Sequence, residues 1–113
     1  MIADCAQKFR TNAARLLSPD TGTDALRAAL AAAYAGEPFV TVLPAGRWPG
    51  TAAVAGGNGA HVQVAADRRS GRATVVAAID NLGKGAAGQA IQNANLMLGL
   101  PETAGLTSIG VAP

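Results

Sequence analysis

The chain has few of the residues that mark several large classes of protein. Its single cysteine, Cys5, has no partner for an internal disulfide, which excludes a disulfide-stabilised scaffold. No apolar run reaches the length of a membrane span, and the first residues lack the apolar stretch of a signal peptide. We therefore expect no membrane partner and a cytoplasmic location.

Charged residues are also scarce, at 14% of the chain, whereas apolar residues make up 50%. Disordered segments show the opposite balance, so the 113 residues predict one folded domain. Aromatic residues contribute only 4%, and alanine and glycine fill much of the apolar fraction. Because small side chains bury little area, we expect a thin core and a chain that associates with further copies of itself.

No run of basic residues supports nucleic-acid binding, although the net charge is +2. The basic cluster of Arg68, Arg69 and Arg72 flanks Ser70-Gly71, a sequence typical of a hairpin tip. No aromatic residue lies among these arginines to stack on bases. The sequence therefore predicts no nucleic-acid partner.

The spacing of apolar residues predicts an α+β fold. Hairpin strands followed by a separate helix favour an antiparallel or mixed sheet with helices on one face. We expect a helix over 23–34 that Thr23 or Asp24 caps, strands over 39–43, 51–54, 61–66 and 73–79, and a helix over 86–98. The apolar run 75–79 is typical of a central strand. Residues 1–12 are interpreted as a mobile extension before a domain over 13–113.

The helix expected over 86–98 carries amides in place of charges. Residues 85–101 contain no charged side chain, and Gln89, Gln92 and Asn93 lie three and four positions apart on one stripe. Amides suit a site that binds a planar neutral group, such as the carboxamide of nicotinamide. Spacing alone favours a second interpretation, in which these amides cap neighbouring loops or line a subunit interface.

Glycines surround Lys84 just before this helix, at Gly83, Gly85 and Gly88. The Walker-type phosphate loop is absent, because no Ser or Thr follows the lysine. We also expect no dinucleotide-binding glycine loop. What remains is a helix N-terminus that could hold an anion or a polar loop.

Three segments of the chain closely resemble the C-terminal region of the N-acetyl-gamma-glutamyl-phosphate reductases, over about residues 13–113. A short one is Val54-x-Gly56-Gly57-Asn58, where Gly57 replaces the serine of the family's Gly-Ser-Asn loop. The two longer ones are Ala78-Ile79-Asp80-Asn81-Leu82-x-Lys84-Gly85-Ala86-x-Gly88-Gln89-Ala90-x-Gln92-Asn93-x-Asn95 and Gly99-Leu100-Pro101-Glu102-Thr103-x-Gly105-Leu106.

Members of this family use NADPH to reduce an acyl phosphate to an aldehyde in arginine biosynthesis, through a Cys thioester and a His acid–base partner. The resemblance implies the substrate and dimerisation domain of the glyceraldehyde-phosphate and semialdehyde dehydrogenases. It also implies that Asn93, followed by Gly88 and Gln89, faces the nicotinamide end of NADP in the intact enzyme. By the same resemblance, Asp80 and Asn81 fix the loop before the helix, and Lys84 orients that loop or meets an anion.

The chain departs from the family in its catalytic parts. It has no Gly-Cys-Tyr-Pro motif and no histidine in the family's catalytic context, so neither Cys5 nor His61 is assigned a catalytic role. One His and one distant Cys also cannot form a metal ligand set. We expect no reductase activity from the isolated chain, with a second copy or the missing Rossmann half as partner. The alternatives are a self-associating interaction module without cofactor, and a complementing subunit for a separate nucleotide-binding chain.

Overall fold

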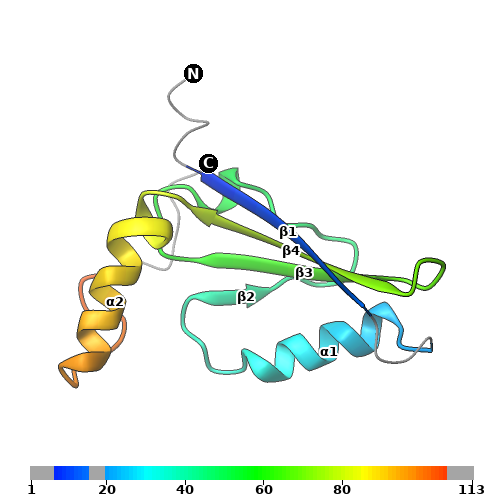
Figure 1. Cartoon of the computed structure of the whole chain (residues 1–113). Coiled ribbons are helices and arrows are strands. Elements are labelled where there is room, and N and C mark those ends of the chain that lie inside the picture. Colours follow the sequence, from blue (N-terminus) through cyan, green and yellow to red (C-terminus); the bar gives the residue numbers. More distant parts are fainter. Residues whose placement is uncertain (1–6, 16–19, 107–113) are drawn as a thin grey trace.

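The structure is a computed structural model that describes residues 7–15 and 20–106, with side chains described from residue 20 onward. Its elements follow one another as β1 (Gln7–Arg15), α1 (Thr23–Ala33), β2 (Val40–Val42), the 3₁₀ turn η2 (Ala52–Val54), β3 (Ala60–Asp67), β4 (Arg72–Asp80), the π-turn η3 (Gly83–Ala87) and α2 (Gly88–Met97) (Figure 1).

The four strands form one mixed sheet in the order β1-β4-β3-β2. Strands β3 and β4 make the predicted hairpin, with Gln63 opposite Val76, and β2 runs parallel to β3. The apolar strand β4 lies between β1 and β3, as its unbroken apolar run predicts. The α+β class, both helices and the strand within 39–43 are confirmed.

Two sequence predictions about the strands are wrong. Gln7–Arg15 forms β1, which pairs antiparallel with the whole of β4, so residues 7–12 belong to the sheet. Residues 1–6 lie outside the described part of the chain, as do the Ser18-Pro19 turn and the tail 107–113. Segment 51–54 turns as η2 instead of extending, because its backbone bonds locally and Val54, 2% exposed, is buried below the loop.

Helix α1 begins without the predicted side-chain cap. Its N-cap is Gly22, and the Thr23 hydroxyl accepts a hydrogen bond from the Ala66 N–H at 2.9 Å. The Thr23 hydroxyl therefore connects the helix to β3 and does not accept a hydrogen bond from the free N–H groups of the first helical turn. Helix α1 therefore packs along β3 beyond the end of β2, and Gly36, with φ of 87°, lies in the turn after it.

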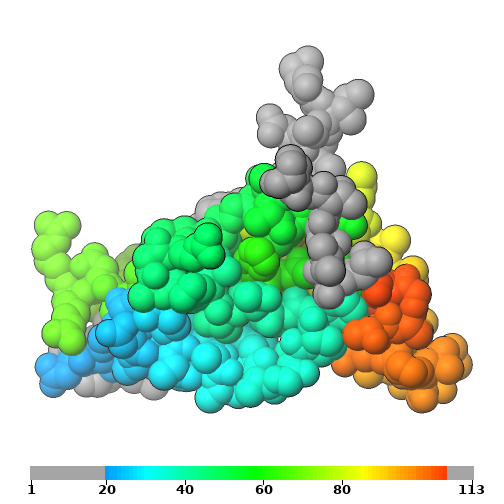
Figure 2. All heavy atoms as spheres, turned by 180° about the vertical axis from the view of Figure 1, so that it is seen from behind, coloured from blue at the N-terminus to red at the C-terminus, as the bar shows by residue number. Residues whose placement is uncertain are grey.

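The two faces of the sheet differ in how they are covered. Gln63, Val76, Ala78 and Asp80 share the face that segment 43–59 covers, and all four are buried. On the opposite face, Val62 and Val64 of β3 are buried, whereas the β4 side chains at 75, 77 and 79 are only half-buried. Helix α2 extends from the end of the sheet instead of lying over it, and with the segment after it forms a projection (Figures 1 and 2). Within the described residues, no helix is long and apolar enough to cross a membrane.

Candidate functional site

The residues singled out by the sequence gather where β4 meets α2. Asp80 ends β4 and is buried, with one carboxylate oxygen accepting from the N–H groups of Leu82 at 2.8 Å and Gly83 at 2.6 Å. The other oxygen accepts from the Gly56 N–H at 2.8 Å. Burial raises the pKa of Asp80, but these three hydrogen bonds outweigh it and hold the pKa below its ordinary value. Asp80 thus fixes the loop that leads into α2.

Gln92 links three segments at this junction. Its Oε1 accepts from the Asn58 Nδ2 at 3.2 Å and from the Lys84 ammonium, and its Nε2 donates to the Glu102 carboxylate. The Lys84 ammonium also lies 5.5 Å from the centre of the Phe39 ring. A neutral amide therefore stands between a cation and an anion, with each end of its dipole facing the matching charge.

The same links set the direction of the Asn58 amide. Because Gln92 presents its acceptor to Asn58, the Asn58 Nδ2 must face it, and the Asn58 Oδ1 is left buried without a hydrogen-bond partner in the described structure. This oxygen lies against the Cα of Gly88, where an added Cβ would be 2.1 Å away. Gly88 is therefore required for the close packing of α2 on the Gly57-Asn58 loop.

One sequence expectation about the glycines is corrected. Gly83, Gly85 and Gly88 do have the G-x-G-x-x-G spacing, directly after β4 and before α2. In a dinucleotide site the helix leads to a further parallel strand, and no strand follows α2 in the described chain. Here the glycines allow close packing, since a Cβ at Gly83 would lie 2.5 Å from the Gly57 carbonyl oxygen.

Asn95, which the sequence analysis did not propose as a site residue, is the buried amide of α2. Its Nδ2 donates to the carbonyl oxygens of Glu102 at 3.1 Å and Ala104 at 2.9 Å, which closes the turn after the helix. Asn95 lies off the predicted stripe but within the longest run of family resemblance. For Gln92 and Asn95, the interpretation that amides cap neighbouring loops holds.

The remaining predicted residues lie on the outside of α2. Asn93 is exposed and makes no hydrogen bond within the described residues, and Gln89 is exposed with one bond to the Gly85 carbonyl oxygen at 3.3 Å. The predicted stripe is therefore divided, with Gln92 turned inward and Gln89 and Asn93 turned outward. Contact of Asn93, Gln89 and Gly88 with NADP stays a prediction.

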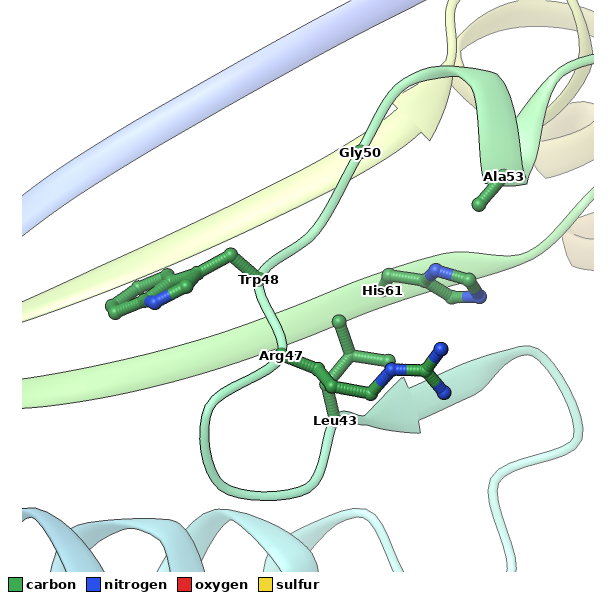
Figure 3. Close-up of a pocket in the computed structure, with 6 residues that line it drawn as sticks. All are labelled: Leu43, Arg47, Trp48, Gly50, Ala53 and His61. Atoms are coloured by element: carbon green, nitrogen blue, oxygen red, sulfur yellow. The ribbon is translucent and has the colours of Figure 1, made fainter.

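The other reactive side chains do not join this junction. Cys5 lies outside the described residues. His61 lies on β3 and lines a separate hollow with residues of segment 43–53 (Figure 3). No group of three His, Cys, Asp or Glu side chains that could hold a metal ion occurs in the described part of the chain.

Comparison with known proteins assigns the chain to a family. Residues 9–81 match the family described as semialdehyde dehydrogenase, dimerisation domain. The similar proteins are named N-acetyl-gamma-glutamyl-phosphate reductase. The one from Frankia casuarinae is 70% identical over 85% of this chain and 28% of its own length. The one from Acidothermus cellulolyticus is 64% identical over 80% of this chain and 26% of its own length.

The similar protein from Streptomyces coelicolor is 56% identical over 100% of this chain and 31% of its own length. Its match includes residues 1–12, where we expected no family resemblance. The chain spans less than a third of the length of each of these three relatives. The chain belongs to the family of semialdehyde dehydrogenase dimerisation domains, and its relatives there are N-acetyl-gamma-glutamyl-phosphate reductases.

Proposed function

We propose that this chain forms the dimerisation part of an NADP-dependent N-acetyl-gamma-glutamyl-phosphate reductase of arginine biosynthesis and has no reductase activity alone. The observation that carries the proposal is the 70% identity, over 85% of the chain, to a protein of that name. The 113 residues hold no Gly-Cys-Tyr-Pro motif, so the acyl-transfer nucleophile has to come from elsewhere in the enzyme. We place the protein in the cytoplasm.

The outer surface of α2 supports a partner in the form of the Rossmann half. Apolar side chains gather at the C-terminal end of the helix, where Met97 is 85% and Leu98 73% exposed, and Leu96 and Leu100 are also exposed. Such a cluster on a helix that leaves its own sheet is typical of an interaction surface. Covering it with the nucleotide-binding half of the reductase would remove this apolar area from water.

The same surface suits the nicotinamide end of NADP. Asn93 and Gln89 each offer a neutral donor and acceptor from the charge-free outer side of α2, which fits a carboxamide. Gly88 would contribute through its position, because it sets how closely the first turn of α2 packs on Asn58. When bound, NADPH supplies the hydride for the reduction, and the role of α2 residues is to orient its carboxamide.

The half-buried face of the sheet supports association with a second copy. Val75, Ala77 and Ile79 line this face on the central strand and are only partly covered. The family is described as a dimerisation domain, and an apolar sheet face is a surface on which two copies can pack.

The proposal is tested with the purified 113-residue chain and a separately produced Rossmann half of a relative. Reductase activity is measured in the reverse direction with NADP, phosphate and the semialdehyde. The chain alone should give no turnover, and the mixture should give turnover if the two halves associate.

Turnover by the chain alone that disappears in Cys5→Ala would contradict the proposal. A chain that dimerises but never binds the Rossmann half would favour the self-associating interaction module. Activity restored by mixing, with both halves encoded as separate proteins, would favour the complementing subunit.

A further inference from the structure

A hollow of about 210 Å³ lies between segment 43–53 and the beginning of β3, apart from the β4–α2 junction. Leu43, Gly50 and Ala53 contribute its apolar wall, Trp48 adjoins it with its ring turned away, and Arg47 and His61 contribute its nitrogen-bearing groups. Figure 3 shows the Arg47 guanidinium beside the His61 imidazole, while the Trp48 ring extends to the other side of the loop. The hollow is smaller than the pockets of about 300–1,000 Å³ that hold drug-sized ligands, so its ligand must be small.

The loop that carries Arg47 is fixed from below by Gln63, which is 1% exposed. The Gln63 Nε2 donates to the carbonyl oxygens of Leu43 at 3.0 Å, Pro44 at 2.8 Å and Arg47 at 2.9 Å. The Gln63 Oε1 is itself held by the Val64 N–H at 3.0 Å and the Arg27 Nε at 3.2 Å. A fully buried amide therefore fixes the position of the Arg47 backbone. The Arg47 side chain extends from this fixed backbone into the hollow.

The charge of this site is uncompensated. Among the described residues, the Arg47 guanidinium has no ion-pair or hydrogen-bond partner, and no carboxylate lines the hollow. Arg27, by contrast, is paired with Asp24 at 2.7 Å and bonded to Gln63. The Arg47 guanidinium and the His61 imidazole together present several N–H donors to one small volume that no carboxylate lines.

We propose that Arg47 and His61 bind the carboxylate of a small aliphatic acid, with its carbon chain against Leu43 and Ala53. The guanidinium fork matches the two oxygens of a carboxylate, and such charge-assisted pairs are stronger than neutral hydrogen bonds. The apolar wall favours an organic acid over inorganic phosphate, because it has no donors for further phosphate oxygens. The site needs neither the Rossmann half nor NADP, so it is independent of the proposed reductase role.

The chain contains its own reporters for a test, because Trp48 is its only tryptophan and His61 its only histidine. The 113-residue chain is titrated with butyrate while tryptophan fluorescence and the NMR signals of the His61 ring are recorded. Parallel titrations use 1-butanol, which keeps the carbon chain without the charge, sodium chloride at matched ionic strength, and inorganic phosphate. Butyrate should give a saturable change in the His61 ring signals, with any change in Trp48 fluorescence following the same curve, and the other three titrants should give weak changes that do not saturate.

The variant Arg47→Gln should weaken butyrate binding at least tenfold. The matched control is Arg69→Gln, which removes an exposed arginine at the hairpin tip and should change the affinity less than twofold. Because Arg47 is exposed, its substitution leaves the core intact, and the comparison of titrants on the unmodified chain gives an answer that does not depend on any variant. Equal responses to butyrate and sodium chloride, tighter binding of phosphate than of butyrate, or full affinity in Arg47→Gln would each overturn the proposal.

Discussion

The β3–β4 hairpin and helix α2 are held in place by different kinds of interaction. Strand β4 is hydrogen-bonded along both edges, to β3 and to β1, through backbone groups that every residue type provides. Helix α2 contacts mainly η3, and it is joined to the rest of the domain through the side chains of Asp80 and Gln92, while Asn95 holds the turn that follows the helix.

This difference predicts at which positions the type of side chain matters. A backbone ladder accepts many side chains as long as the apolar pattern is kept, whereas a junction of side-chain hydrogen bonds requires particular residues at particular positions. The substitutions below test this contrast through the free energy of unfolding.

The largest loss of stability is expected at Gln63, a fully buried polar side chain of the sheet. Gln63→Leu removes the donor to three loop carbonyls and the acceptor for the Val64 N–H, all near the centre of the covered face. Leaving buried polar groups unpaired costs about 1–3 kcal/mol each, and partial access to water limits the total to about 3 kcal/mol. Denaturant unfolding measures the loss.

The control for this variant is Gln89→Leu, which makes the same chemical change at an exposed position of α2. Its effect should stay within about 0.5 kcal/mol. Similar losses in the two variants would mean that the buried amide of Gln63 does not organise segment 43–59.

The next largest effect is expected for Gly88→Ala at the junction. The added Cβ would lie 2.1 Å from the Asn58 Oδ1 and 2.9 Å from the Gly83 carbonyl oxygen, and Asn58 cannot turn away without losing Gln92. Overpacking of this kind costs about 1–3 kcal/mol, and it should appear as lost hydrogen-exchange protection in α2 while β3 and β4 stay protected. Gly50→Ala is the control, since nothing lies within 4 Å of its Cβ position. Equal exchange throughout the Gly88→Ala chain would show that α2 and the sheet unfold as one unit.

A smaller effect is expected from protonation of Asp80. Because its pKa in the folded chain lies below the ordinary 3.8, the stabilisation is present at pH above about 4 and is lost as the pH falls through the folded pKa. The melting temperature of the unmodified chain should therefore fall toward that of Asp80→Asn as the pH is lowered below about 4.

Asp67 at the hairpin tip provides the comparison for Asp80. Hydrogen bonds from Ser70 and Arg69 lower the pKa of Asp67 as well, but this group is fully exposed. Asp67→Asn should therefore change the melting temperature little at any pH. An Asp80→Asn difference that is constant from pH 7 to pH 2 would contradict the role given to the Asp80 charge.

The same contrast explains which helices and strands could be predicted from the sequence. Period-two and period-3.6 patterns predicted the hairpin, the central strand and both helices, because those elements follow from apolar spacing. β1 escaped prediction because its residues, QKFRTNAAR, show no strict alternation, and its position depends on pairing with β4. η2 was predicted as a strand because residues 51–54 have a strand-like composition, but in the described structure this segment pairs with no strand.

At the junction, residue types were predictable but their directions were not. Gln92 and Asn93 are adjacent amides, and only the packing of α2 on Asn58 decides that Gln92 faces inward. Asn95 escaped because its partners are backbone carbonyls of a turn whose path no local pattern encodes. The hollow at Arg47 and His61 also joins segments that only the folded sheet brings together.

The smallest effect on stability is expected for Asn93→Ala, and it separates the two uses of amides on α2. Asn93 is exposed and holds nothing within the described chain, so its loss should change the free energy of unfolding by less than about 0.5 kcal/mol. Asn95→Ala, made beside it, should cost about 1–2 kcal/mol, because two turn carbonyls lose their donor. In the intact reductase the order should reverse, with Asn93→Ala lowering kcat/KM for NADPH about five- to a hundredfold if its amide binds the carboxamide. Measuring melting and kinetics on the same preparations distinguishes the two roles. A stability loss in Asn93→Ala with unchanged NADPH kinetics would remove Asn93 from the proposed site and make Gln89 the residue to test.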